Sequence, residues 1–362
     1  MQSPVHVVHL IPFLLLITLT KSSPSLNSNA TFDDRSSALS PDDTLFAHLR
    51  CFEMFASKQS DQRDRDASIW MGWDERYLQA TDRTPKFMRC VLNRLRFIDA
   101  SSEQFDENIL RTQYNEYKRW LTVSEADVEE FINDINEIGQ LNATDDDAVY
   151  DAFVPLFYNH SKTFFQLFLR DAVVLQNMYD DKIRLSSNSQ LKTFSVREPN
   201  QTVVQFCELQ MSTELWDDIC RIRAYEISNH TEAMERHIAC IFRGFQYLHA
   251  NDSINEEEIA RDYDLIGSLD AASRLYIQQC AIDASHENEV PKRSLTMYSC
   301  LLDGVYRDAF KEAFDFHEIR SGNLTFVLKN LPYDRAEVKQ QILALDKEHC
   351  NDQQQMVGRS AE

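Results

Sequence analysis

Residues 124–139 read Ser-Glu-Ala-Asp-Val-Glu-Glu-Phe-Ile-Asn-Asp-Ile-Asn-Glu-Ile-Gly and give the clearest secondary-structure signal in the chain. The start, from Ser124 to Asp127, is typical of a capped helix N-terminus. Apolar residues then recur three or four positions apart, at Val128, Phe131, Ile132, Ile135 and Ile138. Gly139 stands where a helix ends. The segment is therefore predicted to be an amphipathic helix with one buried face.

The same periodicity recurs in both directions from this segment. Residues 152–174 are rich in phenylalanine and too long for a strand, which predicts a deeply buried helix. Further helices are predicted within 231–249, after a capping box at 253–256, and over 307–319. The chain has only 7 glycines, and no Asn-Gly or Asp-Gly hairpin separates alternating runs. These patterns favour an all-α fold.

Length and composition indicate the number of domains, and the net charge indicates which partners are disfavoured. A chain of 362 residues with 43% hydrophobic and 26% charged residues is typical of a globular protein with two domains. The formal charge of −21 repels nucleic acid and anionic membranes. A neutral or cationic partner is expected, with no nucleic acid and no membrane among the partners.

The N-terminus indicates secretion. An apolar run from Val5 to Thr20, followed by Lys21 and Ser22, predicts a signal peptide over 1–22. Residues 23–40 form a polar lead-in that is predicted to be disordered. A Ser- and Asn-rich stretch over 186–204 marks the boundary between a first domain, 41–190, and a second, 200–362.

The cysteines fit an extracellular protein. All eight follow the signal, which predicts four disulfides and no free thiol. Two precede residue 200 and six follow it, so one bridge is expected in the first domain and three in the second. No Cys-x-x-Cys or His-x-x-x-His pair supports a metal site. Seven Asn-x-Ser/Thr sequons agree with a secreted glycoprotein.

No catalytic or nucleotide motif is present, so we expect neither an enzyme nor a cofactor. One pair of acids stands out. Asp315 and Glu318 lie three apart on a helix whose Phe310 and Phe314 should face inward, so at least one carboxylate lies near the core. A buried carboxylate pair needs a cation. Arg223, a protonated histidine or the ammonium of a ligand would each meet that need.

Several motifs of the second half resemble the long-form D-seven salivary proteins of mosquitoes, within the odorant-binding-protein superfamily. The resemblance spans both domains and rests on these runs: Cys220-Arg221-Ile222-Arg223-Ala224-Tyr225-Glu226-Ile227, Arg236-His237-Ile238-Ala239-Cys240, Asp308-Ala309-Phe310-Lys311 and Phe314-Asp315-Phe316-His317-Glu318, with Tyr298 two residues before Cys300. It implies two disulfide-stapled helical domains of the odorant-binding type.

The resemblance also implies a biogenic-amine pocket in the second domain. Asp315 and Glu318 would bind the ammonium, and His237 and Tyr298 would hydrogen-bond the ring end of the ligand. Arg223 and Tyr225 would order the acids and line the pocket. The segment from Arg223 to His237 is one residue longer than the family pattern and contains a sequon at Asn229.

Four disulfide pairs follow from the same resemblance: Cys51–Cys90, Cys207–Cys240, Cys220–Cys350 and Cys280–Cys300. In the first domain the family has two more cysteines, and Lys86 and Asp146 stand in their places here. The pair is missing together, which is consistent with one lost bridge.

In the first domain the resemblance implies a hydrophobic channel for lipid mediators such as cysteinyl leukotrienes. Trp70, Trp73, Phe87 and the aromatic run over 153–168 are candidates for its wall, with Lys162 or Arg89 as partner for a lipid carboxylate. Aromatic residues at helical spacing are also typical of an ordinary core.

These observations predict a secreted, monomeric salivary scavenger that is not an enzyme. It would bind host serotonin, histamine and catecholamines, and eicosanoids in its first domain, and so oppose vasoconstriction, platelet aggregation and inflammation. Two alternatives stay open. One is a haemolymph carrier of an insect lipid such as juvenile hormone, and the other is an inhibitor of host coagulation proteins that acts through its acidic surface.

Overall fold

The computed structural model describes residues 38–359, except 72–80, 100–103, 120, 169–196, 198–199, 212–213, 216–217 and 250. The predicted signal peptide, nearly all of the lead-in and most of the predicted domain boundary therefore lie outside the described residues. The described residues belong to one compact unit.

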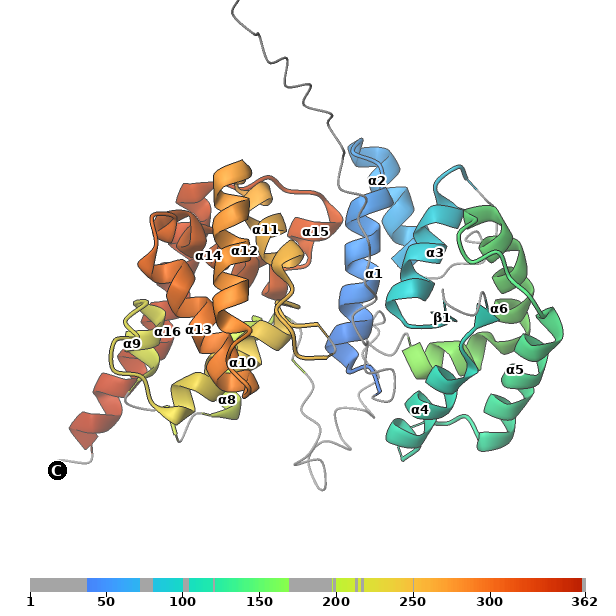
Figure 1. Cartoon of the computed structure of the whole chain (residues 1–362), viewed down its shortest axis with the longest axis horizontal. Helices are drawn as coiled ribbons and strands as arrows, with labels where there is room; N and C mark the ends of the chain where they lie inside the picture. The colour runs from blue at the N-terminus through green and yellow to red at the C-terminus, as the bar shows by residue number, and fades with distance from the viewer. Residues whose placement is uncertain are drawn as a thin grey trace, which may run out of the picture. The chain divides into compact units, whose positions relative to one another are not determined.

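The first half of the described chain is helical, as predicted, with one minimal antiparallel pair of strands. Its elements are α1 (Pro41–Phe55), α2 (Ser60–Asp66), the π-helical η1 (Ala67–Met71), α3 (Thr84–Arg94), β1 (Ile98–Asp99), β2 (Gln104–Phe105), α4 (Glu107–Tyr117), α5 (Glu125–Ile138) and α6 (Asp146–Phe168) (Figure 1). Their buried apolar side chains form one core built from residues 39–168.

The second half contains only helices among the described residues. They are α8 (Val203–Gln210), α9 (Ile219–Arg223), α10 (Glu232–Gly244), α11 (Glu256–Leu265), α12 (Ala271–Ala284), α13 (Val290–Asp303), α14 (Arg307–Gly322), α15 (Thr325–Leu328) and α16 (Arg335–Arg359). One core joins residues 203–314, and a smaller one joins the end of α14 to α15 and α16. The long α16 packs beside α14 and α9 (Figure 1).

The helix ends follow local chemistry. In α5, Ser124 and Asp127 form the predicted capping box, and Gly139 follows the last turn with φ of +70°. The prediction for α11 was wrong in detail: its N-cap is Asn255, whose side chain accepts from the Glu258 amide. Ser253 bonds to Asn251 instead, because a bridge between Leu248 and Ile254 holds this segment out of the helix.

The aromatic helix α6 begins earlier than the predicted residue 152 and is described to Phe168. Its course is broken at His160, which has φ of −120° and ψ of 22°. Nε2 of His160 lies 2.7 Å from a carboxylate oxygen of Asp134 on α5, and its ring stacks on Phe131. Phe153, Phe157, Phe164 and Phe168 are buried in the core.

All eight cysteines are paired. Cys51–Cys90 joins α1 to α3, Cys207–Cys240 joins α8 to α10, Cys220–Cys350 joins α9 to α16, and Cys280–Cys300 joins α12 to α13. These are the pairs that the resemblance implies. Three of them tie down helices that carry candidate-site residues, namely α9, α10 and α13, whereas α14, which carries Asp315 and Glu318, has no disulfide.

Two features are absent from the described residues. None of their helices combines the length and the apolar character that a membrane crossing requires. Nor do these residues contain a group of three or more histidine, cysteine or acidic side chains placed to hold a metal ion.

Candidate functional site

Five of the six residues of the candidate amine site make direct contacts with one another, in two groups. Arg223 is the last residue of α9, and its guanidinium lies 3.5 Å from the Glu318 carboxylate of α14. Tyr225, two residues later, donates from its hydroxyl to Asp315 of α14. The Tyr225 ring stacks on Tyr298 of α13, with the ring centroids 6.4 Å apart.

Arg223 is surrounded by more acids than the sequence suggested. Its Nε lies 2.6 Å from one Glu208 oxygen, and its Nη2 donates to the other at 2.8 Å. Nη1 donates to Asp346 of α16 at 3.0 Å. Two of its nitrogens approach Glu208, whereas a single 3.5 Å contact reaches Glu318, so the short hydrogen bonds of Arg223 go to Glu208 and Asp346 rather than to Glu318.

Glu208 and Asp346 were missed by sequence reasoning. Glu208 directly follows Cys207, and an acid beside a cysteine that ties α8 into the core was the available signal. Asp346 lies on α16, more than a hundred residues from Arg223, and nothing in its spacing points to the site.

The two ligand acids resist ionisation. Burial raises the pKa of Glu318 to about 7, although Arg223 and the hydroxyl of Thr202, 3.1 Å away, favour its ionised form. Burial also raises the pKa of Asp315 to about 6 against the hydrogen bond from Tyr225. Both carboxylates therefore lack a fully compensating cation.

A charge count supports this conclusion. Glu208, Asp315 and Glu318 provide three negative charges, and the nearby cations are Arg223 and Lys311, whose Nζ lies 4.8 Å from the Tyr225 ring centroid. Asp346, 28% exposed, is screened by solvent. Among the described residues these acids outnumber the two cations, and an ammonium placed beside Asp315 and Glu318 would favour their ionised forms.

Aromatic rings pack beside the acids. Tyr298 is 1% exposed and makes edge contacts with Phe310 and Phe314, and Phe314 also meets Tyr225. Burial holds the pKa values of both tyrosines above their ordinary value, so their hydroxyls remain neutral donors. An ammonium attached to an aromatic ring would meet acids at one end and rings at the other.

His237 of α10 is fully buried. Burial, helped by the charge of Arg223, lowers its pKa to about 3, so the imidazole is neutral. Neither ring nitrogen makes a well-formed hydrogen bond to the described residues, although the Cys207 backbone lies close enough to affect its pKa. A neutral imidazole in this state offers a donor and an acceptor to a ligand.

The candidate lipid residues of the first domain are only partly brought together. Trp70 of η1 and Phe87 of α3 are buried and stacked, with ring centroids 4.7 Å apart. Lys162 is exposed on α6, where Asp127 is a charged neighbour, and no described contact joins it to either ring. Trp73 lies outside the described residues.

The structure also describes Lys86 and Asp146, which stand where the family has two further cysteines. Asp146 accepts from Arg89 at 3.0 Å, and Arg89 donates to the Ala143 carbonyl at 2.7 Å, so Arg89 is already engaged within the domain. Lys86 is exposed. An ion pair between α3 and the start of α6 therefore stands near the place of the lost bridge.

A disulfide-bonded, all-α fold with charged and aromatic side chains gathered inside a helical domain defines a protein of the odorant-binding type. No family model matches the chain. It is 62% identical over 360 residues to the long form salivary protein D7L3 of Anopheles gambiae, which covers 99% of this chain and 98% of that protein. The long form salivary protein D7L1 of Anopheles atroparvus is 27% identical over 323 residues, covering 86% and 92%. This chain belongs to the long form D7 salivary proteins, and it is secreted into saliva.

Solved structures share the fold. The AeD7–leukotriene E4 complex superposes with a TM-score of 0.71 at 23% identity, covering 83% of this chain and 96% of that one. The AnSt-D7L1–U46619 complex gives 0.67 at 21% identity, covering 85% and 97%. A mosquito juvenile hormone-binding protein gives 0.53 at 20% identity, covering 79% and 91%.

Proposed function

We propose that the second domain binds host biogenic amines, namely serotonin, histamine and catecholamines, and removes them from the feeding site. The protein acts by stoichiometric sequestration rather than turnover, and so opposes vasoconstriction, platelet aggregation and inflammation. The observation that carries this proposal is the pair Asp315 and Glu318 on α14. Both are withdrawn from solvent, and among the described residues they meet a guanidinium only at the 3.5 Å contact of Glu318 with Arg223.

Each residue has a distinct part in this proposal. The ligand ammonium donates to Asp315 and Glu318, and these charge-assisted bonds are about twice as strong as neutral ones. Glu208 pairs with Arg223 at 2.6 Å, so the Glu318 carboxylate can accept a hydrogen bond from the ligand ammonium. Tyr298 and the neutral His237 hydrogen-bond the polar end of the ring, and Tyr225 lines the site.

Isothermal titration with serotonin tests the proposal. The secreted protein should bind about one serotonin per chain, and Asp315→Ala should weaken binding by about 100-fold or more, because the ammonium loses one of its two buried acids. Asp308→Ala is the matched control, since Asp308 is an exposed acid two turns earlier on the same helix. Absence of serotonin heat from the folded protein would contradict the proposal, and heat with juvenile hormone instead would favour the carrier alternative.

For the first domain we propose an eicosanoid site next to the stacked Trp70 and Phe87. Two solved structures with the same fold are complexes with leukotriene E4 and with U46619. Leukotriene binding should change the fluorescence of Trp70, and the change should disappear in Trp70→Phe. A leukotriene titration that leaves the fluorescence of the wild-type protein unaltered would count against this site.

A further inference from the structure

One turn of α14 takes part in two different sets of contacts. Glu318 points to the candidate amine site through Arg223 and Thr202. Two residues later, Arg320 binds Glu53, which lies on α1 of the first domain. The carbonyl of Ser321 accepts from Arg197, which lies in the predicted boundary between the domains. The turn that carries a ligand acid is therefore held from the other domain.

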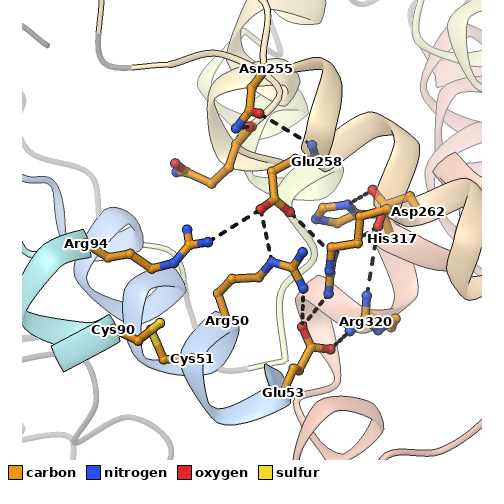
Figure 2. Close-up of polar contacts among 12 residues, drawn as sticks. Arg50, Cys51, Glu53, Cys90, Arg94, Asn255, Glu258, Asp262, His317 and Arg320 are labelled. Atoms are coloured by element: carbon orange, nitrogen blue, oxygen red, sulfur yellow. Dashed lines mark hydrogen bonds and ion pairs between the residues drawn. A yellow bond between two sulfur atoms is a disulfide. The ribbon is translucent and has the colours of Figure 1, made fainter. Parts of the chain in front are cut away.

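Glu53 is the centre of this contact (Figure 2). It is 16% exposed and accepts hydrogen bonds from Arg261 of α11 and Arg320 of α14, with Arg50 of its own helix 3.5 Å away. Burial acts to raise the pKa of Glu53, but the three guanidinium groups lower it below its ordinary value. Glu53 is thus an ionised acid shared by cations from three helices.

Arg50 also pairs with Glu258 at 3.0 Å, and Arg261 lies 3.1 Å from Asp262, so of the three cations Arg320 depends most on Glu53. Asp262 already accepts from Tyr247 at 2.7 Å and lies 2.6 Å from His317, while Arg320 stays 4.0 Å away from it. If Glu53 lost its charge, Arg320 would be left buried with Asp262 as its nearest acid. The side chain would be drawn toward Asp262, and the turn from His317 to Ser321 would move with it.

A second contact between the domains reaches the same turn. Arg197 pairs with Asp42 of α1 at 3.1 Å while donating to the Ser321 carbonyl. The Ser321 hydroxyl accepts from the Val203 amide at 3.0 Å, next to the Thr202 hydroxyl that binds Glu318. Both contacts thus end within three residues of Glu318.

We propose that Glu53 of the first domain is a positioning residue for the amine site of the second, because it holds the turn of α14 that carries Glu318 through Arg320. The inference rests on the proposed amine binding. On this proposal the first domain is a structural component of the amine site. The second domain alone would not fix the position of the Glu318 carboxylate.

Serotonin titrations of the full secreted chain test this role. Glu53→Gln should bind about tenfold more weakly than wild type. Arg320→Gln should show a similar loss, and the double variant should lose no more than either single variant, because both act through one contact. Arg63→Gln is the matched control: Arg63 also crosses between the domains but donates to the carbonyls of Val327 and Leu328, away from Glu318.

The outcomes separate the two proposals. Failure of wild type to bind serotonin would overturn the amine function and this inference with it. Binding by wild type with unchanged affinity in folded Glu53→Gln would overturn the inference alone, as would an equal loss in Arg63→Gln. If Glu53→Gln does not fold, Asp42→Asn breaks the partly exposed second contact and should weaken binding about threefold. Unchanged affinity in that variant would contradict the proposal.

Discussion

The two halves of the molecule are both helical and rich in buried aromatic residues, but they differ in how their buried acids are paired. In the first, the buried acid Asp66 is matched by Arg83 at 2.6 Å, and the buried Gln113 bonds to the backbone of Leu39 and Leu167. In the second, the acids Glu208, Asp315 and Glu318 outnumber the described cations beside them, Arg223 and Lys311. Aromatic packing is dense in both. The difference indicates that unbalanced buried charge, rather than aromatic content, distinguishes the proposed amine site.

The largest effect is expected from a change that breaks the first core. Trp70 is 2% exposed between Phe52 and Phe87, so Trp70→Ala should lower the free energy of unfolding by about 3–5 kcal/mol. Chemical denaturation followed by circular dichroism measures this loss. If a lipid-sized cavity already surrounds the indole, the loss will be below about 1 kcal/mol, and Trp70 will belong to the site rather than to the core.

A smaller effect is expected from a substitution in the second half, at the buried His237. His237→Leu should weaken serotonin binding by about tenfold, because the ring hydroxyl loses a neutral hydrogen-bond partner. Tryptamine, which lacks that hydroxyl, is the matched ligand and should bind the variant and the wild type equally. Equal losses for both ligands in a calorimetric titration would show that His237 only supports the core.

The smallest effect concerns the missing bridge of the first half. Arg89 and Asp146 are 30% and 31% exposed, so solvent screens their pair and Asp146→Asn should cost no more than about 1 kcal/mol of stability. Thermal denaturation at low and high salt is the measurement. A cost of about 2–5 kcal/mol would mean that this pair replaces the lost disulfide in full.

Patterns local in sequence predicted most of the fold. The cap at Ser124 and the apolar spacing that follows it defined α5, because a helix is a repeating local structure. The start of α11 was missed by two residues, since Ser253 and Asn255 are both good caps and a tertiary bridge selects between them. Helical spacing singled out Asp315 and Glu318, whereas the resemblance supplied the disulfide pairs and the roles proposed for the six candidate amine residues.

Contacts between distant segments were beyond the reach of the sequence. The pairing of Arg223 with Glu208 and Asp346, and of Glu53 with Arg320, depends on how separate helices are stacked. Charged residues on helices are usually solvated, so an acid such as Glu53 resembles any other exposed residue until its burial is known. The charge imbalance became visible only when these partners were placed.

The account rests on two buried acids that are short of a cation, and the pH dependence of serotonin affinity tests it most directly. The pKa of Asp315 is raised to about 6 and that of Glu318 to about 7, so lowering the pH protonates both, whereas the ligand ammonium stays charged. Protons then compete with the ligand. Titrations should show affinity about 100-fold weaker at a pH of about 5.5 than at about 8, with a smaller change in Glu318→Gln. Affinity that stays constant over this range would contradict the claim that these carboxylates hold the ligand.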